Sequence, residues 1–392
     1  MINIVKVENK RQLKQFIKFP FSLYKDNPYW VPPLISDEMF NLSKDKNPAF
    51  EYSDAEYWLA YKDGKIAGRI AGIISHSYIE KWGNPYARFG WVDFIDDFEV
   101  SKALFDTVEA WAKEKGLKAV QGPLGFCDLD KEGMLIEGFE ELGTFITIYN
   151  YPYYMKHIEA YGYVKDAEWM EMDITLPGSE AVDKITLLAD KAQAKYGLRV
   201  VPLKKSKDVL PYVPEVFKVY NKGYENLYGE VHVTDKQVAC YVKQFFSFLN
   251  PQYLCLVYDD EDKMAGFGII IPSLSKAVQK TKGRLLPFGF ISFLKAIKKN
   301  DTLDLYLIAI RPELRSKGVP YVMLRELTKT ALKNGVTHAI ASPELETNHA
   351  VHSMWRNFDT RIHRRRRCYI KNLEAKAADD SKDLKADTTS AT

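Results

Sequence analysis

The chain has 392 residues, of which 46% are hydrophobic and 27% charged; these proportions are typical of a globular protein and exclude a largely disordered or membrane-embedded chain. Its length exceeds what one ordinary core accommodates, so we expect two domains. The formal net charge of +3 excludes a strong overall field that would attract nucleic acid.

The N-terminus and the cysteines bear on where the protein works. Residues 1–8 lack the charged-then-apolar pattern of a secretory signal, and no apolar run approaches the ~18 to 20 residues of a spanning helix. We therefore expect a cytoplasmic protein, with contact to a membrane surface left open. Widely spaced cysteines, without a CxxC pair or a histidine at metal-ligand spacing, predict reduced thiols and no metal site: Cys127, Cys240, Cys255 and Cys368.

The first half of the chain predicts a loop, a β-hairpin, a strand, a helix, a strand and a short helix. The hairpin follows from alternating apolar residues on both sides of Asp63-Gly64. The helix follows from the spacing of Leu104, Val108 and Trp111. In chain order the elements are expected at 23–33, 57–74, 89–94, 100–115, from 118 onward and at 153–161.

The second half repeats this order. A hairpin, a strand, a helix, a strand and a short helix are expected at 253–270, 303–310, 320–333, from 337 onward and at 350–358. Two copies of one α/β domain explain the repetition better than chance. We place the domains at 1–176 and 177–373, and we expect the polar tail 374–392 to be disordered because it has almost nothing to bury.

The turn after the strand at 303–310 carries the clearest functional pattern. Residues 311–320, RPELRSKGVP, lead directly into the next helix. Backbone N–H groups and the positive dipole end at a helix N-terminus suit a pyrophosphate, and Arg315 and Lys317 add positive charge. This pattern resembles the acyl-coenzyme A motif of GNAT (GCN5-related N-acetyltransferase) domains. Pro320 departs from it, because it stands where Gly or Ala is usual and lacks an N–H donor.

A second stretch, 346–358, resembles the last helix of GNAT domains, with Asn348 beside the pantetheine arm. Trp355 stands where the family often has a Tyr that protonates the leaving thiolate, and an indole cannot supply that proton. The resemblance implies a fold of two tandem GNAT-like domains, each a mixed, mainly antiparallel sheet with flanking helices. It also implies an acetyl-CoA or longer acyl-CoA site formed by Ile310, Arg315, Ser316, Lys317, Gly318, Val319 and Asn348.

In the family, an amine attacks the thioester directly and a carboxylate removes its proton. The usual position of this base falls near Tyr306, with Asp304 on the same strand face, and Glu346 and Glu344 lie on the adjacent strand end. We expect catalytic residues among Asp304, Tyr306 and Glu346. The alternative for Asp304 and Glu344 is that both are solvated charges at a strand edge.

The first half lacks the pyrophosphate loop, because Asp96, Asp97 and Glu99 occupy the corresponding turn and would repel phosphate. It has instead a long loop from Gly122 to Tyr154, and long loops in compact domains are often functional. The loop's Gly-Pro, Glu-Gly-Phe and Tyr-Asn-x-Pro-Tyr-Tyr elements resemble a largely uncharacterised group of bacterial tandem-GNAT proteins. That resemblance implies an acceptor pocket lined by Glu137, Asn150 and Tyr154; the alternative is a rigid aromatic plug.

Two basic segments bear on partners. Residues 273–300 carry seven Lys and Arg and no acid around a Phe- and Leu-rich centre, which suits a peripheral membrane contact, or else an insertion that buries its apolar stripe. The arginines of 363–369 lie in an expected strand, which we interpret as solvated and basic, and binding to nucleic acid is disfavoured.

Together these patterns predict an acyl-CoA-dependent N-acyltransferase acting on a primary amine, either a small molecule or an amino-lipid. The alternative is a catalytically degenerate pair that binds acyl-CoA or acts as a scaffold. An enzyme of the Fem type, which takes aminoacyl groups from tRNA, is disfavoured because no long basic coiled-coil arm is present.

Overall fold

The computed structural model describes residues 1–356 and 358–374. Its N-terminal half contains β1 (Ile2–Lys6), α1 (Lys10–Leu23), α2 (Ile35–Asn41), β2 (Ser53–Lys62), β3 (Lys65–Ser75), α3 (His76–Trp82), β4 (Tyr86–Phe94), α4 (Phe98–Glu114), β5 (Ala119–Gly122), β6 (Met134–Glu137), α5 (Tyr153–Ala160) and β7 (Val164–Thr175). The predicted hairpin, strand, helix, strand and short helix are all confirmed.

The C-terminal half contains α6 (Ser179–Tyr196), β8 (Arg199–Val200), α7 (Val213–Tyr224), α8 (Asp235–Phe245), β9 (Leu254–Tyr258), β10 (Met264–Pro272), α9 (Ser275–Thr281), α10 (Gly289–Lys298), β11 (Thr302–Ile310), α11 (Val319–Lys333), β12 (His338–Ala341), β13 (Glu344–Leu345), α12 (His349–His352) and β14 (Asp359–Asn372). The helix expected at 350–358 is shorter than predicted, because α12 passes into a 3-10 turn at Ser353–Trp355. Apart from Glu374, the tail that we expect to be disordered lies outside the described residues.

Local sequence explains the elements that were predicted correctly. Asp63 and Gly64 both have positive φ angles, 51° and 75°, as a type I′ turn between β2 and β3 requires. The side chain of Asp97 accepts hydrogen bonds from the backbone N–H groups of Glu99 and Val100 and so caps α4. The acidic turn of the first half is therefore a helix cap.

All the strands belong to one sheet, whose main path runs β1-β2-β3-β4-β5-β14-β7-β12-β11-β10-β9-β8. Each half contributes an antiparallel run that ends in one parallel pair, β4 with β5 and β11 with β12. The fold class predicted from the sequence is confirmed, and the sheets of the two halves are joined edge to edge.

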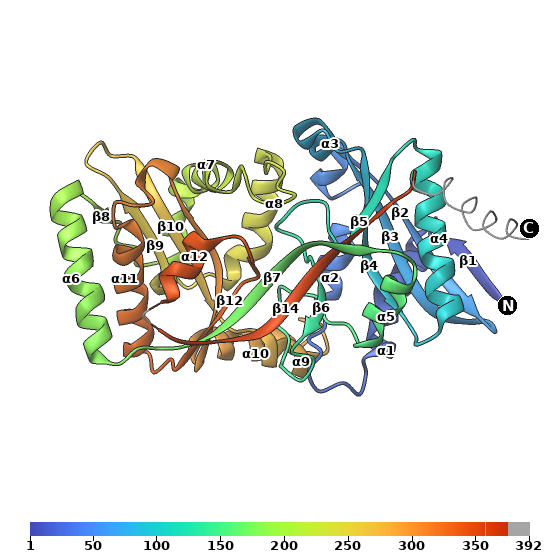
Figure 1. The fold of residues 1–392 in the computed structure, drawn as a ribbon. Coiled ribbons are helices and arrows are strands. Elements are labelled where there is room, and N and C mark those ends of the chain that lie inside the picture. The colour runs from blue at the N-terminus through green and yellow to red at the C-terminus, as the bar shows by residue number, and fades with distance from the viewer. Residues whose placement is uncertain (357, 375–392) are drawn as a thin grey trace, which may run out of the picture.

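The joint is made by an exchange of strands. β14, from the end of the chain, pairs with β5 and β7 of the N-terminal half. β7 in turn pairs with β12 and β13 of the C-terminal half. Figure 1 shows these two long strands running side by side through the middle of the molecule. The boundary near Leu176 thus remains a prediction, and the sheet of each half includes a strand from the other.

Helices cover the faces of the sheet. α4 packs on β2 and β3 in the N-terminal half, and α6 and α11 lie side by side on the C-terminal half (Figure 1). Each half has its own large apolar cluster, one around Phe89, Phe94 and Phe105 and the other around Val319, Val322 and Met323. No helix among the described residues is long and apolar enough to cross a bilayer.

The arginines of β14 correct one expectation. Arg364 and Arg366 are each only 1% exposed, and both pair with the buried carboxylate of Glu171 on β7. Arg365 and Arg367 point to the other side of the strand and are partly exposed. The expectation of a solvated basic strand was therefore wrong for the two inward arginines, because their face of the strand lies inside the joint.

Candidate functional site

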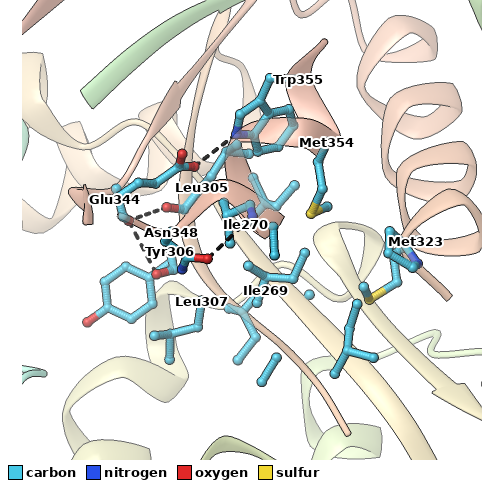
Figure 2. A pocket seen from close by; sticks show the side chains of 18 of the residues that line it. Ile269, Ile270, Leu305, Tyr306, Leu307, Met323, Glu344, Asn348, Met354 and Trp355 are labelled. Carbon is cyan, nitrogen blue, oxygen red and sulfur yellow. Dashed lines mark hydrogen bonds between the residues drawn. The ribbon is translucent and has the colours of Figure 1, made fainter. Parts of the chain in front are cut away.

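The site begins where β11 and β12 part. These parallel strands pair from Thr302 with His338 as far as Leu305 with Ala341. β12 then ends, whereas β11 continues to Ile310 along β10. The hydroxyl of Ser342 donates to the carbonyl oxygens of Leu305 and Tyr306 and holds the turn that leads the chain away. Among the described residues, β11 therefore has no strand partner on this side beyond Leu305. Figure 2 shows Leu305 and Tyr306 at this point.

A cavity of about 730 Å³ extends from this opening. It runs beneath α11, whose Met323, Leu324, Leu327 and Ala331 face it, and over β10. Small residues such as Gly268 and Ala339 lie in its wall and leave the space unfilled. The volume is within the range of about 300 to 1,000 Å³ typical of ligand pockets. Ile270 belongs to the same apolar cluster as Met323 and Met354, whereas Ile269 and Leu307 pack in the cluster that includes residues of α7; Figure 2 labels these five side chains.

The predicted coenzyme loop lies at one end of the cavity. Ile310, Arg315, Ser316, Gly318 and Pro320 line it. The exposed Arg315 donates a hydrogen bond to the Gly223 carbonyl oxygen at 2.7 Å. Pro320 lies in the first turn of α11, where its missing N–H costs the helix no internal bond.

Gly318 is required for a reason that the sequence did not show. Its φ is +79°, and a Cβ there would lie 2.5 Å from the Cβ of Ala192 on α6. Lys317 and Val319 do not line the cavity. Lys317 lies over the Tyr196 ring at 5.8 Å from its centroid, and the side chain of Val319 is fully buried in the core.

The cavity also contains Glu344, which lies on the short strand β13 and faces Trp355 (Figure 2). Trp355 Nε1 donates to Glu344 Oε1 at 2.9 Å. Glu344 Oε2 accepts no hydrogen bond from the described residues and lies 3.8 Å from His352 Nε2. Burial raises the pKa of Glu344 to about 7. Asn348, also in the wall, caps α12 by accepting from the Val351 N–H.

Glu344 was not among the expected catalytic residues, and the three that were expected lie in different surroundings. Tyr306 lines the cavity, and burial raises its pKa. Asp304 is 2% exposed and outside the cavity lining; burial raises its pKa to about 7. Glu346 pairs with Lys165 at 2.8 Å near the surface. The interpretation of Asp304 and Glu344 as solvated strand-edge charges was wrong, because Asp304 is 2% exposed and the side chain of Glu344 is 11% exposed.

Three carboxylates from the N-terminal half also line the cavity, and sequence reasoning missed them. Asp128, Asp130 and Glu132 lie on the long loop after β5. Burial raises the pKa of Asp130 to about 6 and that of Glu132 well above its ordinary value. Asp128 accepts a hydrogen bond from Tyr220 of α7. The sequence did contain a signal for them, because acids at every second position lie in a loop that was already expected to be functional.

The residues expected to line an acceptor pocket lie outside the lining of this cavity. Asn150 bonds the backbone N–H and carbonyl of Leu135 at 2.7 and 3.0 Å. Tyr154 is fully buried, with its hydroxyl 2.7 Å from that of Tyr24. Glu137 is exposed and lies 3.2 Å from Arg365. The contacts of Asn150 and Tyr154 are those of a packed aromatic plug.

No model of a known protein family matches the chain. Among solved structures, the tandem GNAT protein from the clavulanic acid biosynthesis pathway superposes with a TM-score of 0.56 at 12% identity, over 96% of this chain and 100% of that one. The GCN5-related N-acetyltransferase from Sphaerobacter thermophilus gives 0.50 at 9% identity, over 95% and 96% of the two chains. The fold is that of a tandem GNAT protein.

Sequence relatives match almost the whole chain. Protein YghO of Escherichia coli (strain K12) is 30% identical over 376 residues, which is 93% of this chain and 94% of the relative. The bacterial ceramide synthase of Caulobacter vibrioides (strain NA1000 / CB15N) is 24% identical over 382 residues, 95% of this chain and 98% of the relative. The chain belongs to the family of Protein YghO.

Proposed function

We propose that the protein is an acyl-CoA-dependent N-acyltransferase that moves a long acyl chain to the primary amine of a lipid. The observation that carries this proposal is the apolar cavity that continues beneath α11 from the strand opening. From Pro320 to Ala331 the helix rises about 16 Å. An extended polypeptide advances about 3.5 Å for every three backbone bonds. By the same geometry, a length of about 16 Å accommodates an extended acyl chain of on the order of a dozen carbon–carbon bonds.

The coenzyme end of the proposed site lies at the N-terminus of α11. The backbone N–H groups of Ser316, Gly318 and Val319 and the guanidinium of Arg315 suit a pyrophosphate. The N–H of Lys317 already donates to the Leu314 carbonyl oxygen at 3.0 Å, so Lys317 would contribute through its charge. Ile310 and Asn348 lie where the pantetheine arm would enter between the parted strands, as part of the cavity wall.

The proposed chemistry is direct transfer. The amine nitrogen attacks the thioester carbonyl carbon, the carbon–sulfur bond breaks, and an amide and coenzyme A leave. Glu344 takes the proton of the attacking amine and returns it to the departing thiolate, so charges and protons balance. A pKa near 7 suits this role, because enough of the group is ionised to accept a proton at neutral pH. Trp355 holds the carboxylate in place.

The acceptor would be drawn in as an ammonium ion and would release one proton to solvent before the neutral amine attacks. The carboxylates of Asp128, Asp130 and Glu132 face the cavity from the N-terminal half, where they suit a cation. The named activity of the Caulobacter relative, a ceramide synthase, supports an amino-lipid acceptor such as a sphingoid base over a small polar amine. The N-terminal half would then supply the acceptor side of the site.

Calorimetric titration with palmitoyl-CoA and acetyl-CoA tests the proposal, with the transfer to a long-chain amine followed by mass spectrometry. We expect tighter binding of palmitoyl-CoA. Ala331→Phe fills the far end of the cavity and is expected to weaken palmitoyl-CoA binding by about tenfold or more, since several buried methylene groups lose their place. The control Leu332→Phe, on the exposed side of the same turn, leaves it unchanged.

Equal affinity for both thioesters in the native protein and in Ala331→Phe would contradict a long-chain donor. Tight binding of palmitoyl-CoA without turnover of any amine would favour the alternative, a pair of domains that binds acyl-CoA without catalysis.

A further inference from the structure

An exposed apolar surface lies on the insertion between β10 and β11. We call it the α9–α10 surface, and it comprises residues 275–299. Five large apolar side chains cluster on it with exposures of 78, 74, 44, 43 and 58%: Leu286, Phe288, Phe290, Ile291 and Leu294. Such a concentration of exposed apolar side chains marks an interaction site.

The underside of this surface is already occupied. Phe293, on the inward face of α10, is 2% exposed and packs with Val31, Leu34 and Phe145 of the N-terminal half. The side chain of Gln279 on α9 also donates hydrogen bonds to backbone carbonyl oxygens of the segment 28–30. The insertion is therefore fixed across both halves, and its apolar outward face is left for a partner.

Positive charge surrounds the apolar residues. Seven exposed basic side chains lie in the segment, and none forms an ion pair with a carboxylate of the described residues: Lys276, Lys280, Lys282, Arg284, Lys295, Lys298 and Lys299. On α10, Ile291, Leu294, Lys295 and Lys298 follow helical spacing and share one side. Residues 273–300 contain no acidic residue, so no carboxylate within the segment compensates this charge.

We propose that the α9–α10 surface docks the protein on an anionic phospholipid bilayer. α10 is ten residues, about 15 Å, which is half the ~30 Å of a hydrocarbon core. It can therefore lie in the interface, with Phe and Leu side chains among the acyl chains and Lys and Arg at the headgroups. A second copy of the chain would bring the same seven cations face to face, which opposes self-association through this surface.

The position of the surface adds to the argument. The insertion leaves the sheet at the end of β10 and returns at the start of β11, and both strands line the cavity. Docking would bring the cavity to the membrane from which a lipid amine is drawn. The proposal does not depend on the acyl-transfer chemistry, because membrane binding is measured without any substrate.

Flotation of the full chain with vesicles tests it, using phosphatidylcholine alone and phosphatidylcholine with about 30% phosphatidylglycerol. We expect flotation with the anionic vesicles and its loss as salt rises from about 0.1 to 0.5 M. Reversing three charges with Lys295→Glu, Lys298→Glu and Lys299→Glu is expected to weaken binding by about tenfold or more. The control reverses Lys191, Lys329 and Lys333 to Glu on exposed positions of α6 and α11, so the net charge changes equally.

A second pair of variants tests the apolar part. Phe288→Ser with Leu294→Ser removes exposed side chains and is expected to lower vesicle affinity by about tenfold, whereas Leu187→Ser with Leu188→Ser on α6 leaves it unchanged. Absence of flotation in the native protein overturns the proposal. Equal losses in the surface variants and their controls overturn it too, as does dimerisation through this surface. Acyl transfer in detergent, assayed separately, reports on the proposed enzyme activity whatever the vesicles show.

Discussion

Glu344 combines burial, an oxygen without a hydrogen-bond donor among the described residues, and contact with the cavity. We predict that Glu344→Gln lowers kcat by about 10² to 10⁴, the usual contribution of a general base. Because the base must be ionised, the native rate should rise with pH and level off above pH 7, following the pKa of about 7. Initial rates at saturating acyl-CoA between pH 5.5 and 9 measure both effects.

Glu346→Gln is the matched control, because it makes the same chemical change two residues away, where the carboxylate only pairs with Lys165. Its rate and pH profile should match those of the native protein. A Glu344→Gln variant that retains full activity with the same pH dependence would show that the proton leaves by another route, with Asp128, Asp130 and Glu132 as the remaining carboxylates in the cavity lining.

The parts of the site that could be predicted are those whose residues lie close together in the sequence. The turn before α11 was recognisable because Gly318 and the residues beside it act within a few positions of one another. Glu344 and the acids at 128–132 could not be placed in the same way. They come from opposite halves of the chain, and only the folded arrangement buries them around a shared cavity. Sequence alone thus indicated a coenzyme loop and left the remainder of the cavity undefined.

At the scale of whole elements, the place of residues 363–369 in the GNAT pattern correctly predicted a strand, whereas the expected solvation of that strand was wrong for Arg364 and Arg366. Alternation shows that Arg364 and Arg366 share a face, but it does not show what covers that face. The loop between β6 and α5 covers it, because the carbonyl oxygens of Leu142 and Ile148 accept hydrogen bonds from these two arginines. The ionic partner is Glu171 on the neighbouring strand β7, 193 residues before Arg364. The distance between Glu171 Oε2 and Arg364 Nη2 is 2.8 Å, and these residues are almost fully buried.

This buried triad predicts the cost of breaking the joint. Glu171→Ala leaves two buried guanidinium groups without a counterion, and removal of one partner from a buried ion pair costs about 3 to 5 kcal/mol. We expect a loss of that size in the free energy of unfolding, measured by urea denaturation. Glu346→Ala, which breaks an exposed pair, should cost less than about 1 kcal/mol. Equal losses in the two variants would show that the triad contributes no more than a surface contact.

At the scale of the whole molecule, the repeated order of elements correctly predicted two copies of one fold. Each copy was expected to be a separate domain. The repeat could not show that the last strand of each copy lies beside the other copy, because an exchanged strand has the same sequence pattern as one that stays. Only pairing partners distinguish the two arrangements, and those partners lie far away along the chain.

The exchange predicts that the halves depend on each other to fold. Without β14, the edges of β5 and β7 in a fragment 1–176 would expose unpaired N–H and C=O groups. The fragment 177–374 would in turn lack β7 beside β12 and β14. We expect each fragment alone to aggregate or to be digested rapidly by protease, and the two co-expressed fragments to purify as a protease-resistant 1:1 complex.

A second cut, placed after residue 163, serves as a control. It leaves β7 with the C-terminal fragment and should not rescue the N-terminal fragment, because β5 still lacks β14. A stable, monomeric fragment 1–176 with the dispersed amide spectrum of a folded protein would show that the N-terminal half closes its own sheet, and that the exchange is not needed for its fold.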